Sequence, residues 1–559
     1  MDLRLLAAEP TTAEREAIDA VVGAPETNGY RVTRADRGRR HLLLPALRAA
    51  QRRAGWVSEG ALGYASRRLD VPPADAYGVA SFYALLSLEE RPADVLHVCT
   101  DLSCRLAGAE VPAGAHPSPC LGLCERAPAS LRTTAGDEPR EIQLPEVGPP
   151  LPQLGDPGLR LLRRVGVADP QSMDSYVSHG GYTALRRALE LGPTEVLNEV
   201  TASRLLGRGG AAFPTGVKWE AVAKQPTQPH YLVCNADESE PGTFKDRVLM
   251  EEDPFALIEA MTIAAYATGC EHGFLYVRAE YPLAHARLEG ALEQARGRGF
   301  LGDDVMGAGF AFDAELRIGA GAYVCGEETA LFQSIEGYRG EPRNKPPFPV
   351  EVGLFGKPTV VNNVETLFNV PEVVNEGGAA FAAMGTEGST GTRLFCVSGH
   401  VARPGLYEVP FGATLGELLE LAQARPPKAV LLGGAAGAFV GPDRLDLPLT
   451  FEDTRAAGVT LGSGVVIVYD ESADLVDAVL RIAEFFRDES CGQCVPCRVG
   501  TVRQEEALRR LAAGRGRDDE LATLADLGQV MRDASICGLG QTAASAVESA
   551  IANLGVFST

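Results

Sequence analysis

Two groups of cysteines carry the clearest chemical signal in this 559-residue chain. The late group, ESCGQCVPCRVGT, places Cys491, Cys494 and Cys497 at two-residue gaps, and Cys537 follows further along the chain. Three thiolates on one tight loop suit one face of a cubic cluster, and a distant fourth completes a Cys₄ site for a [4Fe–4S] cluster. A structural Cys₄ zinc site is the alternative, although such sites more often pair two separated C-x-x-C motifs.

The early group combines a C-x₄-C motif, Cys99 and Cys104, with a C-x₃-C motif, Cys120 and Cys124. Two ligand pairs on neighbouring loops suit a [2Fe–2S] cluster. A zinc site, or a site that no longer holds metal, are the alternatives.

Charge and hydropathy narrow the class of protein. The chain has 74 acidic and 52 basic residues, a net charge of −22, which disfavours a nucleic-acid partner. We find no run of 18 apolar residues, and Asp2 and Arg4 interrupt the first apolar stretch, so we expect neither a membrane segment nor a signal or transit peptide. The expected compartment is the cytoplasm, where thiols stay reduced, and the 12 cysteines are therefore interpreted first as metal or redox ligands.

A glycine-rich segment, LGRGGAAFPTGVKW, lies before the first clear strand of the central region. Glycines let backbone N–H groups approach a phosphate or a planar ring closely, and Arg208 and Lys218 add positive charge. A mobile surface loop is the alternative.

Two further segments place polar residues after predicted strands. HYLVCNADESEPGTFKDR runs into Asn235, Asp237, Glu238 and Glu240, and ligands of open α/β sheets bind at the carboxyl ends of strands. A solvated acidic turn is the alternative. LRIGAGAYVCGEETALFQSIEG repeats the pattern with carboxylates that open a helix, where they could simply favour the helix dipole.

Helical and strand periodicity divides the chain into six predicted regions. They are an N-terminal helical region (1–88), a unit with the early cysteines (89–147), a proline-rich linker (148–175), an α/β unit with a largely parallel sheet (176–390), a small β-rich α+β unit (391–470) and a helical unit with the late cysteines (471–559). The fold class we expect is therefore multidomain α/β.

Six motifs occur in a specific order: GRGGAAFPTGVKW, CNADESEPGTFKDR, GAGAYVCGEETAL, KPPFP, NNVETL and ESCGQCVPCR. With them, residues 176–559 resemble the FMN-containing, NADH-reactive subunit of respiratory complex I and its relatives. These relatives include the diaphorase subunits of NAD-reducing hydrogenases and the β subunits of NAD-dependent, molybdenum- or tungsten-containing formate dehydrogenases. The resemblance implies a Rossmann-like FMN and NAD unit, a ubiquitin-like (β-grasp) unit at 391–470 and a C-terminal helical bundle with the [4Fe–4S] cluster.

The front part, residues 13 to about 135, looks like the thioredoxin-like [2Fe–2S] subunit of complex I, here fused to the flavoprotein. Such fusion is similar to the hydrogenase and formate dehydrogenase versions. ESCGQCVPCR with MRDASICGLGQTA looks closest to the formate dehydrogenase β subunits.

The resemblance also implies which residues bind the cofactors. For FMN they are Gly207, Arg208, Gly209, Gly210, Lys218, Asn235, Asp237, Glu238, Tyr323, Gly326, Glu327, Asn362 and Asn363. For NAD(H) they are Phe213 and Phe348 around the adenine, with Glu240, Glu328 and Lys345 around the nicotinamide and ribose. No protein acid, base or nucleophile is implied, because hydride passes directly between nicotinamide and flavin.

Two departures from the family pattern stand out. Only 15 residues separate Cys104 from Cys120, where the family usually has a helix and a strand, so the thioredoxin-like unit is truncated. Ala212 stands where the family commonly has glycine.

Taken together, these features predict the NAD-reducing half of a larger enzyme that exchanges electrons with a molybdenum or tungsten formate dehydrogenase α subunit. A hydrogenase module, or a complex I-like enzyme, is the alternative partner. The alternative hypothesis is that the protein is not an enzyme but a scaffold with two structural zinc sites. A colourless purified sample would identify it, because flavin and iron–sulfur clusters absorb visible light.

Overall fold

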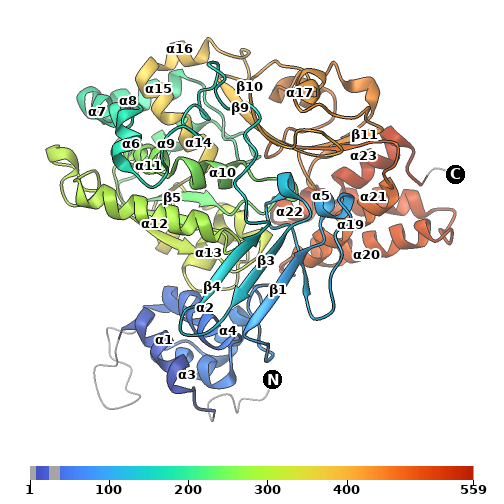
Figure 1. Cartoon of the computed structure of the whole chain (residues 1–559), viewed down its shortest axis with the longest axis horizontal. Helices are drawn as coiled ribbons and strands as arrows, with labels where there is room; N and C mark the ends of the chain where they lie inside the picture. Colours follow the sequence, from blue (N-terminus) through green and yellow to red (C-terminus); the bar gives the residue numbers. More distant parts are fainter. Residues whose placement is uncertain (1–7, 24–37, 558–559) are drawn as a thin grey trace.

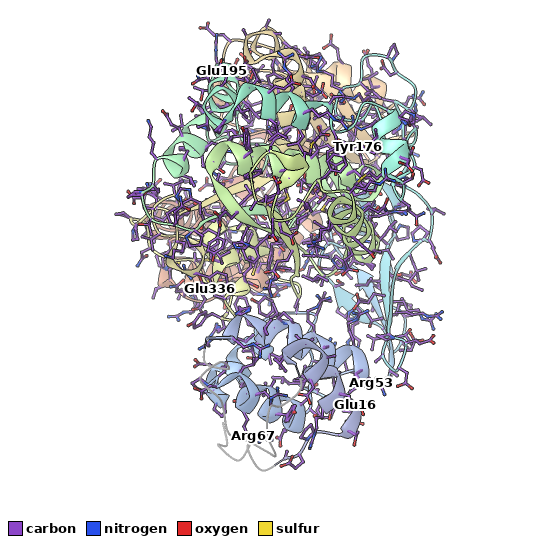
Figure 2. All side chains as sticks on the ribbon, turned by 90° about the vertical axis from the view of Figure 1, so that its left-hand side faces the viewer. Glu16, Arg53, Arg67, Tyr176, Glu195 and Glu336 are labelled. Atoms are coloured by element: carbon purple, nitrogen blue, oxygen red, sulfur yellow. The ribbon has the colours of Figure 1, made fainter. Side chains whose placement is uncertain are left out.

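The computed structural model describes residues 8–23 and 38–557 and builds them around three β-sheets. Figure 1 shows a small helical lobe at one end, formed by the start of the chain, below a much larger body. Figure 2, turned by 90°, shows the same lobe beneath the body, with Glu336 close to the boundary between them.

The lobe is an N-terminal helical bundle. Its helices are α1 (Thr12–Val22), α2 (Leu43–Ala54), α3 (Glu59–Leu69) and α4 (Pro73–Ala80). Thr11 and Glu14 form a capping box that starts α1, and Pro73 starts α4 where its missing N–H costs no helix bond. The bundle joins the body through a 2.7 Å hydrogen bond from the Tyr83 hydroxyl to Ser334 and through Arg40, which stacks on Tyr338 at 3.8 Å.

The first sheet follows the bundle in the order β2-β1-β3-β4. Its elements are β1 (Asp94–Cys99), α5 (Leu102–Leu106), β2 (His116–Ser118), β3 (Ser130–Thr134) and β4 (Arg140–Leu144). Between Cys104 and Cys120 the described chain holds only the end of α5 and the short β2, so this thioredoxin-like unit is small. β4 pairs with β3 along its whole length and ends directly before Pro145.

The second sheet is entirely parallel, in the order β7-β6-β5-β8. Its strands are β5 (His230–Ala236), β6 (Cys270–Val277), β7 (Asp313–Ile318) and β8 (Thr359–Asn363). The helices around it are α6 (Met173–Ser178), α7 (Thr183–Leu191), α8 (Pro193–Ala202), α9 (Thr215–Ala223), α10 (Lys245–Glu252), α11 (Pro254–Thr268), α12 (Pro282–Gly297), α13 (Glu328–Ile335), α14 (Val364–Phe368), α15 (Val370–Glu376) and α16 (Gly378–Ala382). Nearly every residue of α11 is buried, which explains why its sequence is apolar on all sides.

The third sheet has five strands in the order β10-β9-β13-β11-β12. Its elements are β9 (Thr392–Gly399), β10 (Gly405–Pro410), α17 (Leu415–Leu421), β11 (Ala429–Leu432), β12 (Ala438–Val440), α18 (Phe451–Ala456) and β13 (Val465–Tyr469). The first and last strands pair in parallel at the centre, as in a β-grasp unit. β11 and β12 are the short strands of this sheet, with four and three residues.

The chain ends in a helical unit that holds the late cysteines. Its helices are α19 (Leu475–Glu489), α20 (Val495–Ala512), α21 (Glu520–Ala534), α22 (Gly538–Thr542) and α23 (Ser545–Leu554). Asp474 starts α19 by accepting the N–H groups of Val476 and Asp477. The multidomain α/β class predicted from the sequence is confirmed, while the residue limits of the six regions stay predictions.

The front sheet lies among the other three units. Asp101 pairs with Arg481 of α19 at 3.3 Å, and Ser103 hydrogen-bonds Ser398 of β9 at 3.0 Å. Glu125 forms a fully buried ion pair with Arg247 of α10. The thioredoxin-like unit is therefore built into the body.

Candidate functional site

The carboxyl edge of the parallel sheet forms the centre of the candidate site. From β5 the chain crosses to β6 and β7 on one side, whereas β8 pairs with β5 on the other side. The connections that leave β5 and β8 therefore diverge, and ligands of open α/β sheets bind at such switch points. Asn235 and Asp237 stand at the end of β5, and Asn362 and Asn363 at the end of β8.

The turn after β7 lies against the end of β5. Asn235 Nδ2 donates to the carbonyl of Gly326 at 2.8 Å, and Asn235 Oδ1 accepts the N–H of Asp237 at 3.2 Å. A Cβ on Gly326 would lie 3.5 Å from Asp237, so the backbone approaches closely here. Burial raises the pKa of Asp237 well above its usual range, and its Oδ2 is buried without a partner.

The two asparagines of β8 differ in whether their side-chain amide groups have hydrogen-bond partners. Asn362 Oδ1 accepts from the indole of Trp219 at 3.3 Å, while its Nδ2 is buried without a partner. Asn363 caps α14 and donates to Asp246 Oδ2 at 2.7 Å, so its side chain is already bonded within the protein. Unpartnered atoms on Asp237 and Asn362 are the polar groups that a bound ligand would satisfy.

The glycine-rich loop forms a turn that a backbone hydrogen bond closes. Gly207 N–H donates to the carbonyl of Phe213 at 2.9 Å, which closes the loop just before α9. A Cβ on Gly209 would lie 3.1 Å from the Asn363 side chain, so the loop lies directly against the end of β8. Gly210 and Ala212 both have positive φ, +115° and +51°.

The two cations of this loop are used differently. Lys218 Nζ donates to the carbonyl of Val361 in β8 at 3.0 Å, and burial lowers its pKa. Arg208 is fully buried and donates to the carbonyl of Thr390 at 2.7 Å, with its guanidinium over the ring of Phe411. The guanidinium of Arg208 therefore binds the segment before β9, and only the backbone of Arg208 lies in the glycine-rich loop.

Glu238 also differs from the expectation for its side chain. Its carboxylate accepts the N–H groups of Asp246 and Arg247 at the start of α10, at 2.7 and 2.9 Å. The Tyr281 hydroxyl adds a third bond of 3.0 Å, and burial raises the pKa of Glu238 to about 8. The carboxylate of Glu238 is therefore bonded to the start of α10, and only the backbone of Glu238 lies along the site.

Glu240 and Tyr323 meet beside the turn that follows β7. The Tyr323 hydroxyl donates to Glu240 Oε2 at 2.5 Å, and the N–H of Ala436 donates to Glu240 Oε1 at 2.8 Å. Burial raises the pKa of Glu240 to about 7, although these donors oppose the shift.

Lys345 bridges the two carboxylates that open α13. It donates to Glu327 at 2.9 Å and to Glu328 at 2.6 Å, and Glu327 also caps the helix. Burial alone would lower the pKa of Lys345, but the two glutamates raise it.

Phe213 and Phe348 are the large aromatic side chains near this edge that stay half exposed, at 50% and 53%. Lys218 Nζ lies 5.8 Å from the Phe213 ring centroid. Exposed aromatic faces of this kind are available to stack against a planar ring.

The late cysteines come together in one pocket. Cys491, Cys494, Cys497 and Cys537 line it together with Val324, Pro342 and Leu539. Burial raises the pKa of Cys497 to about 12 and that of Cys537 to about 11. Four thiol donors around one apolar pocket suit an iron–sulfur cluster.

The early cysteines also come together, despite the short gap. All four are buried, and the Sγ atoms of Cys120 and Cys124 lie 3.4 Å apart. Cys99 and Cys104 pack in one buried cluster, and the Cys104 and Cys120 thiols raise the pKa of the Cys99 thiol well above its usual range. The missing helix and strand therefore leave the four-thiol arrangement intact.

Sequence reasoning missed two arginines beneath the early cysteines. Arg278, directly after β6, donates to the carbonyl of Cys120 at 2.6 Å, and Arg247 donates to the carbonyl of Gly122 at 2.9 Å. Arg278 also donates to the carbonyl of Glu238 at 2.6 Å. Its place at a strand end in HGFLYVR was the available signal.

Four family profiles match the chain. They are described as the Nuo51 FMN-binding domain (residues 200–372), the NADH-ubiquinone oxidoreductase-F iron-sulfur binding region (477–555), the thioredoxin-like [2Fe-2S] ferredoxin (31–113) and the SLBB domain (394–430).

Alignments with individual relatives extend over most of the length of each relative. The F 2 subunit of the NADH-quinone oxidoreductase of Rhizobium meliloti (strain 1021) is 46% identical over 397 residues, which is 70% of this chain and 94% of that protein. The chain belongs to the family of NADH-oxidising subunits with FMN and iron–sulfur clusters. NADP-reducing hydrogenase subunit HndC of Solidesulfovibrio fructosivorans is 44% identical over 385 residues, 68% of this chain and 78% of that protein. A chain of the NAD⁺-reducing [NiFe]-hydrogenase in its air-oxidized state matches with a TM-score of 0.79 and 34% identity, over 92% of both chains.

The cofactors of this NADH-oxidising subunit are FMN, a [4Fe–4S] cluster, a [2Fe–2S] cluster and NAD(H). The glycine turns and the unpartnered atoms of Asp237 and Asn362 fit a planar ring with polar edges, as FMN has. The thiols of each cysteine group lie together, and the matching profiles describe iron–sulfur regions rather than zinc sites. Within the described residues, no helix is long and apolar enough to cross a membrane.

Proposed function

We propose that this chain is the NAD(H)-reactive flavoprotein subunit of a soluble, cytoplasmic NAD-linked enzyme. The observation that carries the proposal is the carboxyl edge of β5 and β8. There the glycine loop approaches Asn363, the turn at Gly326 approaches Asp237, and buried polar atoms of Asp237 and Asn362 have no partner. When bound there, FMN would supply hydride exchange with nicotinamide and one-electron exchange with iron–sulfur clusters.

The protein's part is to bind and orient. The backbone of the loop from Gly207 to Gly210 and the side chains of Lys218, Asn235, Asp237 and Asn362 would hold the flavin. The half-exposed rings of Phe213 and Phe348 would hold the adenine of NAD(H), while Glu240, Glu328 and Lys345 would hold the rest of the nucleotide. NADH oxidation releases two electrons and one proton; the electrons leave singly through the clusters and the proton leaves to solvent.

We propose that the late cysteine loop passes electrons to another subunit. Gln493, between two of its cysteines, is exposed, and Val495, Val499 and Val502 form an exposed apolar stripe along α20 directly after the loop. Exposed apolar stripes of this kind mark protein interfaces. We propose that the catalytic partner docks here, next to the [4Fe–4S] site.

For the partner we propose a molybdenum or tungsten formate dehydrogenase α subunit. The support is the likeness of the segments ESCGQCVPCR and MRDASICGLGQTA to formate dehydrogenase β subunits. A hydrogenase module is the second candidate. It is favoured by the match to the NAD⁺-reducing hydrogenase chain, which extends through the front unit and covers 92% of both chains.

The test is to purify the chain anaerobically with the subunits that accompany it in its natural host. Formate-dependent reduction of NAD⁺ supports the first partner, and hydrogen-dependent reduction supports the second. The isolated chain should contain one FMN and about six iron atoms, and it should reduce ferricyanide with NADH. A colourless protein with zinc and no flavin would refute the whole proposal.

A further inference from the structure

The β-grasp unit reaches the candidate site through one turn. Residues Gly433–Gly437 connect β11 to β12, and the turn is closed by a 2.9 Å bond from Gly437 N–H to the carbonyl of Gly434. Gly433 and Gly434 have φ of +87° and +82°, a left-handed conformation that favours glycine.

This turn packs directly on Glu240. Its Ala436 N–H donates to Glu240 Oε1 at 2.8 Å, while the Tyr323 hydroxyl holds the other oxygen. A Cβ on Gly434 would lie 2.6 Å from Glu240 Cγ and 2.7 Å from Oε1. The turn therefore restricts the Glu240 side chain. The Gly434 backbone lies against one side of it, and each carboxylate oxygen accepts one hydrogen bond.

The segment that carries Glu240 is fixed to the same unit at two more points. A Cβ on Gly242 would lie 2.5 Å from Val465 of β13, so this backbone runs in contact with the sheet. The Thr243 hydroxyl lies 2.9 Å from that of Ser463. Three contacts along four residues make the β-grasp unit the support of this part of the site.

We propose that the Gly433–Gly437 turn is a positioning element for Glu240, which it holds in place for contact with the nicotinamide nucleotide. The inference rests on the proposed function and adds a role for the β-grasp unit in it. Two neutral donors aim the carboxylate, and among charged groups Asp101 acts on it from the front unit. Fixed geometry of this kind matters because small displacements of binding groups reduce rates strongly.

The experiment compares two glycines of the same unit. Gly434→Ala introduces the contact with Glu240, whereas Gly458→Ala is its matched control, with φ of +72° and nothing within 4 Å of the new Cβ. Both variants carry the same left-handed strain, so their difference isolates the contact. Each is combined with Glu240→Ala, which removes the atoms that the new Cβ would meet.

We expect Gly434→Ala to lower kcat/KM for NADH with ferricyanide by about ten- to hundred-fold at unchanged FMN content, and Gly458→Ala to stay within about two-fold. The melting temperature should fall further for Gly434→Ala than for Gly458→Ala, with or without cofactor. In the Glu240→Ala background both differences should disappear, since the two changes act through one contact.

Equal kinetics and equal melting for the two glycine variants would overturn the inference, as would an undiminished Gly434→Ala effect in the Glu240→Ala background. If Gly434→Ala alone does not accumulate as folded protein, recovery of folding by Glu240→Ala supports the inference and failure to recover overturns it. A wild-type chain that holds FMN but does not oxidise NADH refutes the proposed function instead, and the melting comparison then still reports on the contact.

Discussion

The guanidinium of Arg278 donates a 2.6 Å hydrogen bond to the backbone carbonyl of Cys120, and so joins the parallel-sheet unit to the loop of the early cysteines. The same side chain pairs with Glu280 at 2.7 Å and is almost completely buried. A fixed positive charge thus lies beside a cluster ligand, where it favours the more negative, reduced state of the cluster.

Arg278→Ala should therefore lower the midpoint potential of the [2Fe–2S] cluster, because that positive charge is lost. It should also cost about 3–5 kcal/mol of unfolding free energy, because Glu280 is left buried without its partner. Redox titration followed by electron paramagnetic resonance, and denaturant unfolding, measure the two effects. The control is Arg296→Ala, in an exposed pair with Asp313, which should cost about 0–1 kcal/mol.

Cys494→Ser should remove the [4Fe–4S] cluster and leave about two iron atoms per chain instead of about six. NADH–ferricyanide activity should persist, because this acceptor takes electrons at the flavin, while electron transfer to the partner subunit should stop. Cys270→Ser is the control, since this buried thiol in β6 belongs to neither cysteine group and contacts the Thr268 hydroxyl. Unchanged iron in Cys494→Ser would contradict the ligand assignment.

Glu240 should make the protein less stable as pH rises. Burial raises its pKa to about 7, so between its unfolded pKa, near 4.5, and pH 7 the folded state binds the proton that the unfolded state has lost. Stability from this group is full below the unfolded pKa and declines as pH rises through about 7.

Glu240→Gln cannot ionise, so its loss of stability between pH 5 and 8 should be smaller than that of wild type by about 1–3 kcal/mol. Glu238 has a raised pKa of the same sign, so the difference between variant and wild type is the quantity to measure. Exposed Glu315→Gln serves as control. Parallel stability curves for Glu240→Gln and wild type would contradict the prediction.

Ala212 and its neighbour Ala211 should respond to glycine in opposite directions. Ala212 has φ of +51°, a left-handed conformation that is costly for alanine, so Ala212→Gly should stabilise the chain by about 0.5–1 kcal/mol. Ala211 is exposed and its φ is not positive, so Ala211→Gly should destabilise it by about 0.4–1 kcal/mol. Thermal or denaturant unfolding of both variants tests the sign.

Glu408 fastens the segment between the front unit and the body. Its buried carboxylate accepts the backbone N–H groups of Arg160, Leu161 and Leu162 at 3.0–3.1 Å. Glu408→Ala leaves these donors unpaired and should cost about 2–4 kcal/mol. Glu420→Ala, on the exposed face of α17, should change stability by no more than about 0.5 kcal/mol.

Sequence reasoning recovered the features that spacing and local chemistry encode. Short stretches of sequence are enough to recognise the cysteine groups, the glycine loop and the strand that ends near Asn235. The contacts that hold these parts together are not local: Arg278 reaches Cys120 across 158 residues, and Ala436 reaches Glu240 across 196. No periodicity in one sequence reports such pairs.

The same distinction explains the side chains that point elsewhere than expected. Arg208 and Glu238 stand inside the right motifs, but buried neighbours satisfy them first: a carbonyl at Thr390 and the open N–H groups of α10. A motif shows where the backbone passes. Tertiary packing decides which atoms remain for a ligand.

The pairing of Asp101 with Arg481 spans 380 residues, and this separation orders events during synthesis. At about 5–20 residues per second, roughly 20–80 seconds pass between the emergence of the two partners from the ribosome. The early cysteines are therefore among the first ligands to be made, and the contact of their unit with the C-terminal helices is among the last to form. Iron–sulfur maturation of this chain has that interval in which to act before this contact closes.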